Sequence, residues 1–205
     1  MTDYELYRFI LRELPDLNEM TVLDCGCARG VWGYLLRSEK NGYKTTIIGL
    51  DRYNPYLSFC KTFHVYNNLV KADIRHLPFR DSAFEIVIAI EVLEHLEKTD
   101  GTKFLSELER VCKRKLVLST PNGFWKQGAL GGNNLELHRS GWTVNELKNL
   151  GFRVHGIGFK FVKVYDVDPR VWGFFFYIFT PFSYVIPTLA HHLVASKEKI
   201  VLAEK

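Results

Sequence analysis

The 205-residue sequence is poor in cysteine, and its four cysteines form no cluster with metal-site or disulfide spacing. Cys25 and Cys27 lie in one short glycine-containing stretch, whereas Cys60 and Cys112 stand alone. Zinc sites and the disulfide frameworks of small secreted domains have spacings that these positions do not match. We therefore expect a reduced, cytoplasmic protein.

The sequence also lacks a long basic run, a secretory leader, an internal repeat and a low-complexity segment. Its formal net charge of +4 is small, so a nucleic-acid partner is not indicated. Acidic residues begin at Asp3, where a leader would carry basic ones. With 47% hydrophobic residues, the chain is long enough for one domain covering residues 1–205. Residues 1–20 should supply an amphipathic helix that ends before Pro15.

The glycine fingerprint of dinucleotide-binding proteins is missing as well. The segment 21–30 reads TVLDCGCARG, an apolar strand that runs into a small-residue loop. In the pattern G-x-G-x-x-G, counted from Gly26, glycines would be required at Ala28 and Val31. The absence of both glycines argues against a nicotinamide-dependent oxidoreductase, although a related sheet remains expected.

Acidic residues follow three successive predicted strands. Asp24 ends the first, and Asp51 follows the strand 45–50, where open α/β folds place a carboxylate on ribose hydroxyls. Asp73 and Ile74 follow a short third strand near residues 69–72.

The pattern Asp24-x-Gly26-x-Ala28-x-Gly30 closely resembles the first motif of the class I S-adenosylmethionine (SAM)-dependent methyltransferases, of the small type-11-like kind. The segment ADIRHLPF, which contains Asp73, is a second resemblance. The resemblance implies that the loop holds the methionine part of SAM and that Asp73 meets the adenine amino group. The implied SAM-binding residues are Asp24, Gly26, Cys27, Ala28, Gly30, Asp51, Arg52, Asp73, Ile74 and Glu91.

Alternating strands and helices predict an α/β fold, a doubly wound Rossmann-like sheet. The run FEIVIAI at residues 84–90 is typical of a central parallel strand covered on both faces. The family resemblance implies seven strands in the order 3-2-1-4-5-7-6. The last strand, within residues 191–199, would be antiparallel and would lie between the fifth and sixth.

Glu91, Glu94 and His95 follow the fourth strand, and a helix there would place them on one face. With His138, they would suit Mg²⁺ or Mn²⁺. This Glu-x-x-Glu-His pattern resembles the small-RNA 3′-terminal ribose O-methyltransferases and the ubiquinone-biosynthesis O-methyltransferases. The RNA family carries a second histidine beside the last one, where this chain has Leu137 and Arg139. Two alternatives to a metal site remain. His95 or His138 could act as a general base, or the segment could be a solvent-exposed, charged helix start with no role in catalysis. The candidate catalytic and metal-binding residues are Glu91, Glu94, His95 and His138.

Two further segments bear on the methyl acceptor. The glycine-rich stretch 124–139 should be an acceptor-side loop. No Asp, Glu, Lys or Arg occurs in residues 171–194, and their aromatic-rich part, 171–190, is expected to be a helical insertion before the last strand. Pro181 and Pro187 should divide it into two short helices. These would either form a lid or dip into a membrane surface, with Arg170, Lys197 and Lys199 near headgroups, or else pack on the sheet or on a second subunit.

The sequence therefore predicts methyl transfer from SAM to an acceptor. The favoured acceptor is an oxygen on a small or lipid-like molecule. One alternative is a metal-assisted methyltransferase acting on a ribose or an RNA end. The other is a non-catalytic SAM-binding partner protein associated with a membrane.

Overall fold

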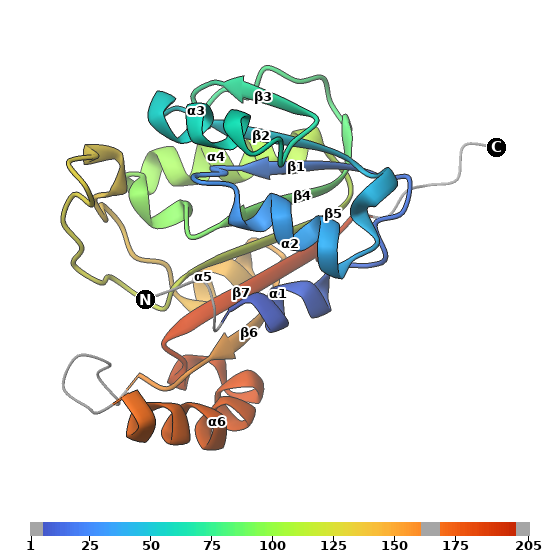
Figure 1. Ribbon diagram of the computed structural model, residues 1–205. Helices are drawn as coiled ribbons and strands as arrows, with labels where there is room; N and C mark the ends of the chain where they lie inside the picture. The colour runs from blue at the N-terminus through green and yellow to red at the C-terminus, as the bar shows by residue number, and fades with distance from the viewer. Residues whose placement is uncertain (1–5, 161–168, 200–205) are drawn as a thin grey trace.

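The computed structural model describes residues 6–160 and 169–199. Its seven strands form one sheet in the order β3-β2-β1-β4-β5-β7-β6, as the family resemblance implied (Figure 1). The strands are β1 Thr21–Cys25, β2 Thr46–Asp51, β3 Asn68–Lys71, β4 Phe84–Ile90, β5 Cys112–Pro121, β6 Arg153–Ile157 and β7 His192–Glu198.

Helices cover both faces of this sheet (Figure 1). The α-helices are α1 Tyr7–Glu13, α2 Val31–Glu39, α3 Asn54–Thr62, α4 Lys98–Val111, α5 Val144–Asn149 and α6 Pro169–Val185. Short 3₁₀ turns are η1 Gly42–Lys44, η2 Leu93–His95, η3 Asn134–Glu136 and η5 Pro187–Leu189. Side chains of α1, α2 and α3 share one buried cluster, and those of α4 and α5 share the other. The fold is therefore three-layered.

The first five strands are parallel, and β7 runs antiparallel between β5 and β6. Nearly every residue of β4 is buried, which explains its continuous apolar run. Because the parallel strands point the same way, their carboxyl ends meet at one edge, beside the loop 124–139 (Figure 1). Ligands of open α/β sheets bind at such an edge.

The N-terminal helix and the capping signals agree with the sequence. Helix α1 ends before Pro15, although residues 1–5 of the predicted segment lie outside the described part. Thr143 and Glu146 form the expected capping box at the start of α5. The helical stripe predicted on α4 is also buried, from Phe104 through Leu108.

The prediction of two short helices after residue 169 is wrong. Helix α6 is continuous from Pro169 to Val185 with Pro181 inside it, and it ends before Pro187. A proline removes one backbone bond, but packing on β6 compensates, because Thr180 and Ser183 are buried. Within residues 6–160 and 169–199, no helix combines the length and the apolar character that crossing a bilayer requires.

Candidate active site

The loop after β1 is wound tightly. Gly26, Ala28 and Gly30 all have left-handed φ angles, of +81°, +42° and +83°. A Cβ at Gly26 would lie 2.5 Å from the Val92 side chain, so both the conformation and the space favour glycine there. The amides of Gly26 and Cys27 donate to the Leu50 carbonyl. The loop is thereby fixed against the end of β2.

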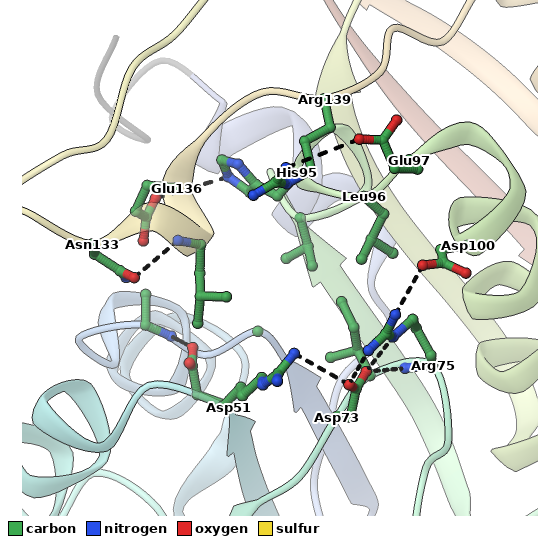
Figure 2. A pocket seen from close by; sticks show the side chains of 16 residues that line it. Asp51, Asp73, Arg75, His95, Leu96, Glu97, Asp100, Asn133, Glu136 and Arg139 are labelled. Atoms are coloured by element: carbon green, nitrogen blue, oxygen red, sulfur yellow. Dashed lines mark hydrogen bonds and ion pairs between the residues drawn. The ribbon is translucent and has the colours of Figure 1, made fainter.

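A cleft of about 360 Å³ opens in front of this loop (Figure 2). Its walls come from the ends of several parallel strands, from η2 and from the loop 124–139. The lining residues are Gly26, Ala28, Asp51, Arg52, Asp73, Ile74, Arg75, Val92, His95, Leu96, Glu97, Asp100, Asn133, Leu135, Glu136 and Arg139. Six of the ten predicted SAM-binding residues, namely Gly26, Ala28, Asp51, Arg52, Asp73 and Ile74, are therefore brought together along one cleft.

Four other residues predicted to bind SAM are not part of that lining. Asp24 is only 1% exposed, and the hydroxyl of Tyr66 donates to its carboxylate over 2.6 Å. Cys27 is also buried, and Gly30 begins α2, packed near Cys60. These residues lie behind the cleft wall, where they shape the loop. Glu91, the fourth, is described below.

Asp51 joins the loop to the cleft. One carboxylate oxygen accepts from the amide of Ala28 at 3.0 Å, and the other accepts from the amide of Tyr53 at 2.8 Å. Burial raises the pKa of Asp51, while the two amides act in the opposite direction. Each carboxylate oxygen has a further lone pair, which leaves Asp51 able to accept from hydroxyl groups in the cleft.

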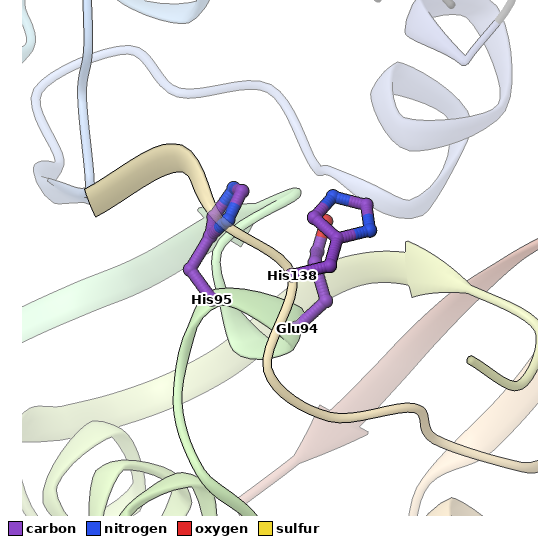
Figure 3. Close-up of side chains that lie close together, drawn as sticks. All are labelled: Glu94, His95 and His138. Carbon is purple, nitrogen blue, oxygen red and sulfur yellow. The ribbon is translucent and has the colours of Figure 1, made fainter. Parts of the chain in front are cut away.

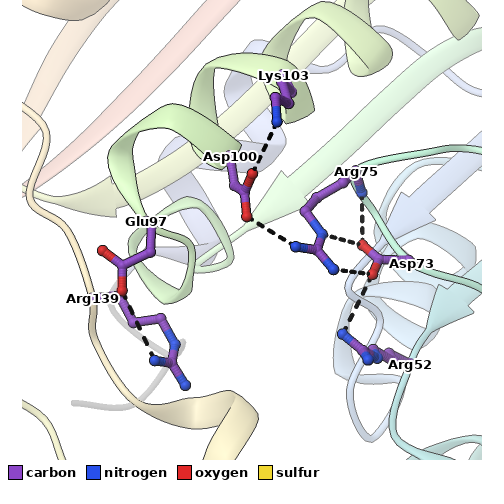
Figure 4. A network of polar contacts seen from close by, with 7 residues as sticks. All are labelled: Arg52, Asp73, Arg75, Glu97, Asp100, Lys103 and Arg139. Atoms are coloured by element: carbon purple, nitrogen blue, oxygen red, sulfur yellow. Dashed lines mark hydrogen bonds and ion pairs between the residues drawn. The ribbon is translucent and has the colours of Figure 1, made fainter.

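Asp73 is the centre of a polar network (Figure 4). Arg75 donates to both of its oxygens, at 2.9 and 2.6 Å, and Arg52 reaches it at 3.3 Å. Arg75 also contacts Asp100 of α4 at 2.9 Å. The hydrogen bonds from Arg75 lower the pKa of Asp73 to about 2. The carboxylate predicted to meet adenine is thus ionised and held in place by arginine.

The α-helix that would have placed Glu91, Glu94 and His95 on one face does not form. Glu91 adopts a left-handed φ of +54°, and only the short turn η2 follows. The amide of Glu91 donates to the Ser119 carbonyl, and its carboxylate accepts from the Ser119 hydroxyl at 2.6 Å. His192 lies 3.3 Å from the same carboxylate. These contacts direct the Glu91 carboxylate towards β5 and β7.

Glu94, His95 and His138 nevertheless converge (Figure 3). One potential ligand atom from each lies within 4.8 Å of the others. Glu94 is 1% exposed, and neither of its carboxylate oxygens has a hydrogen-bond partner among the described residues. Burial, followed by the charge of Glu91, raises the pKa of Glu94 well above its usual value. This carboxyl group is therefore neutral, or ionised beside a cation.

Backbone carbonyls orient the two imidazoles. Nδ1 of His138 lies 2.7 Å from the Trp125 carbonyl, and Nδ1 of His95 lies 3.3 Å from that of Leu137. A carbonyl only accepts, so Nδ1 carries a proton in each ring. In neutral His138 this leaves the lone pair on Nε2, whereas Nε2 of His95 lies 3.8 Å from a carboxylate oxygen of Glu136. Burial lowers the pKa of His138, which favours its neutral form.

The loop 124–139 closes one side of the cleft. Asn133, Glu136 and Arg139 contribute to the lining. The Tyr56 hydroxyl of α3 donates to Glu136 over 3.0 Å, and the backbone amide of Arg139 donates to the Glu94 carbonyl over 2.8 Å. The loop is therefore attached both to α3 and to η2.

Comparison with known proteins places this geometry in a family. The family model described as "Methyltransferase domain" matches residues 23–118, which include β1, the glycine loop, Asp51, Asp73 and η2. A solved SAM-dependent methyltransferase from Archaeoglobus fulgidus aligns with a TM-score of 0.60, covering 97% of this chain and 95% of that one at 20% identity. Residues 23–118 thus match a methyltransferase domain, and the fold is that of the class I SAM-dependent methyltransferases.

Several known proteins are similar to this chain in sequence. An uncharacterized protein of Methanocaldococcus jannaschii is 30% identical over 74% of the chain and 63% of its own length. A sterol 24-C-methyltransferase of Schizosaccharomyces pombe is 35% identical over 45% of the chain and 25% of its length. A ubiquinone biosynthesis O-methyltransferase of Rickettsia bellii is 28% identical over 57% of the chain and 48% of its length. The chain thus spans less than two thirds of each relative's length.

Sequence reasoning missed a set of buried and half-buried residues around His191 and His192. Nδ1 of His191 lies 2.7 Å from Nδ1 of His192, and His192 contacts Glu91. The Trp125 ring lies 4.0 Å from the His191 ring, centroid to centroid. Burial and the neighbouring His192 lower the pKa of His191 to about 3. Two adjacent histidines at the start of an apolar strand were the signal available in the sequence.

Proposed function

We propose that this protein transfers a methyl group from SAM to an oxygen atom of a small or lipid-like acceptor. The cleft carries the proposal: the glycine loop, Asp51 and the Asp73–Ile74 pair all line it, and these groups suit an amino acid, a ribose and an adenine respectively. The relatives named as sterol and ubiquinone biosynthesis methyltransferases support an apolar acceptor.

The chemistry asks the protein mainly for positioning, because the sulfonium of SAM is already an activated leaving group. The acceptor oxygen forms a bond to the methyl carbon as the bond from that carbon to sulfur breaks. The electron pair of the broken bond neutralises the sulfonium and leaves S-adenosylhomocysteine. Nε2 of His95 or of His138 accepts the proton of the acceptor hydroxyl, since each ring holds its own proton on Nδ1.

Calorimetric titration tests the donor site. SAM and S-adenosylhomocysteine are expected to bind, and NAD is expected not to bind. Binding of NAD without heat from SAM would refute the proposal. A SAM-consumption screen over phenols, lipid-linked substrates, sugars and RNA ends then tests methyl transfer. Binding of SAM without turnover of any acceptor would favour the non-catalytic alternative.

A second candidate function is metal-assisted methyl transfer, favoured by the buried carboxylate of Glu94. Its two unpartnered oxygens, with Nε2 of His95 and of His138, fit a site for Mg²⁺ or Mn²⁺. A metal there would hold acceptor oxygens and lower the pKa of an acceptor hydroxyl. Glu91 is directed to Ser119 and His192, so it is a weaker candidate ligand.

Manganese binding is measured directly by the loss of the free Mn²⁺ electron paramagnetic resonance signal. The metal hypothesis predicts one bound ion per chain, lost in Glu94→Gln and in His138→Ala but kept in Glu39→Gln, which removes an exposed carboxylate at the end of α2. No binding by the wild type would reject it. Activity unaffected by chelator, by His95→Ala and by His138→Ala would reject both the metal and the histidine base.

A further inference from the structure

Helix α6 carries a stripe of exposed apolar side chains. Phe174, Ile178, Phe182, Val185 and Ile186 are between 43% and 78% exposed. Phe174, Ile178, Phe182 and Val185 are three or four residues apart, which places them along one side of the helix, and Ile186 directly follows its end. We call this set the α6 stripe. Five large apolar residues exposed side by side differ from the isolated apolar residues of an ordinary surface, and such patches mark interaction sites.

The opposite side of α6 is anchored to the domain. The Phe179 ring stacks on Phe159 with centroids 4.8 Å apart, and the Tyr184 ring stacks on His155 at 4.0 Å. Ser183 is fully buried, and a Cβ at Gly156 would lie 2.3 Å from its carbonyl oxygen. The helix therefore rests firmly on β6, and the α6 stripe is the side that faces away from this packing.

Two exposed arginines lie near the end of α6. Arg12 of α1 and Arg153 of β6 both act electrostatically on the Tyr184 hydroxyl. Glu13 acts there as well, but it is largely buried and accepts a hydrogen bond from Ser196 over 2.8 Å. The helix itself adds no acid, since the sequence from Pro169 to Lys197 contains no Asp or Glu. The exposed rim at this end of the stripe is therefore cationic.

The lysines that the sequence suggested for this rim lie elsewhere. Lys197 bonds to Glu109 of α4 at 2.8 Å, and Lys199 bonds to the Cys112 carbonyl at 2.9 Å. The side chains of Arg170, Phe175 and Tyr177 lie outside the described residues.

We propose that the α6 stripe docks onto the surface of an anionic lipid bilayer, with Phe182 and its neighbours in the interfacial layer and Arg12 and Arg153 against headgroups. An apolar helix side with a cationic rim is the pattern of helices that lie in a membrane interface. A second copy of the chain fits less well, because a two-fold contact through α6 would bring the same cationic rims together. The inference does not depend on the proposed chemistry.

Flotation on a density gradient tests the docking with the full chain and two sets of vesicles, of phosphatidylcholine alone and of phosphatidylcholine mixed with phosphatidylglycerol. The wild type is expected to float with the anionic vesicles, and less of it as salt rises. The double variant Ile178→Asp, Phe182→Asp should bind at least about tenfold more weakly, since two apolar side chains leave the interface. Phe63→Asp is the matched control, because Phe63 and Phe182 are each 60% exposed.

Circular dichroism and SAM titration check that each variant folds. The proposal is overturned if the wild type stays at the bottom of the gradient with anionic vesicles, or if the double variant floats as the wild type does. Light scattering provides a third readout. If the wild type were a dimer that did not float, and the double variant were a monomer, the stripe would instead be a contact with a second copy of the chain.

Discussion

Each carboxylate oxygen of Asp51 accepts a hydrogen bond from a different backbone amide, and this arrangement leads to a prediction about SAM binding. In Asp51→Asn only one acceptor oxygen remains, and the new amide group meets an N–H of Ala28 or Tyr53. The loop should loosen and a charged acceptor for ribose hydroxyls is lost. We expect the Kd for SAM to rise roughly tenfold to a hundredfold, about 1–3 kcal/mol. Titration calorimetry measures it.

The control for that variant is Glu39→Gln, which neutralises an exposed carboxylate at the end of α2. It should bind SAM like the wild type. Equal affinities for the wild type and Asp51→Asn would show that Asp51 contributes nothing to the donor site.

Asp73 predicts a dependence of stability on pH. Its pKa is about 2 in the folded protein because Arg75 donates to it, against about 3.9 in an unfolded chain. A carboxyl group with a depressed pKa stabilises the fold above its unfolded pKa, and this stabilisation is lost as the pH falls towards the folded value. The contribution is therefore full near pH 7 and disappears between about pH 4 and pH 2.

Asp73→Asn should accordingly lower the free energy of unfolding by up to about 2 kcal/mol at pH 7. Urea titrations of both proteins at a series of pH values would show the two curves converging in acid. A difference that stayed constant down to pH 2 would mean that the network stabilises the fold by packing and not by the charge of Asp73.

At the scale of the element, α2 offers two alanine substitutions with opposite expectations. A Cβ at Gly33 would lie 2.5 Å from the Tyr66 ring, which is itself bonded to buried Asp24. Gly33→Ala should cost about 2 kcal/mol of stability through overpacking, although alanine is the better helix former. Ser38 is exposed on the same helix, so Ser38→Ala should be neutral or slightly stabilising. Thermal unfolding compares them, and a stabilising Gly33→Ala would contradict the packing.

Elements whose signal is local were predictable from the sequence. The strand at residues 84–90 was predicted with its observed bounds, because a continuous apolar run records burial on both faces. The end of that strand was not predictable. A helical spacing of Glu91, Glu94 and His95 is a local pattern, whereas the conformation of Glu91 depends on Ser119, which is far away in sequence.

Helix α6 and the site share this limitation. Pro181 is a valid local signal for a break, but packing on β6 decides the outcome. Likewise the cleft could be anticipated from Asp51 and Asp73 at strand ends, whereas the engagement of Asp73 by Arg75 and the contact of His192 with Glu91 require the folded chain. Sequence patterns predict where strands end, but they do not show which side chains contact one another in the folded cleft.

At the scale of the whole molecule, β7 holds β6 to the rest of the sheet. Val194 is 1% exposed in its centre and pairs with Ser119 of β5 and His155 of β6. Val194→Ala should lower stability by about 2 kcal/mol, since it leaves space between the sheet and the helix layer on one of its faces. Glu198→Ala, at the exposed end of β7, removes only a surface ion pair with Lys115 and should change stability by less than about 0.5 kcal/mol. Chemical denaturation measures both, and equal effects would contradict this account.

The position of β7 also determines the order of events while the chain is being synthesised. Residues 192–198 leave the ribosome after every other strand, yet they fill the gap between β5 and β6. Until then, the emerging chain presents an unpaired edge on β5, one of the most buried strands in the finished sheet. Such an edge pairs readily with other chains. The interval between translation of residue 157 and release of residue 198 is therefore the period in which this protein most needs a chaperone.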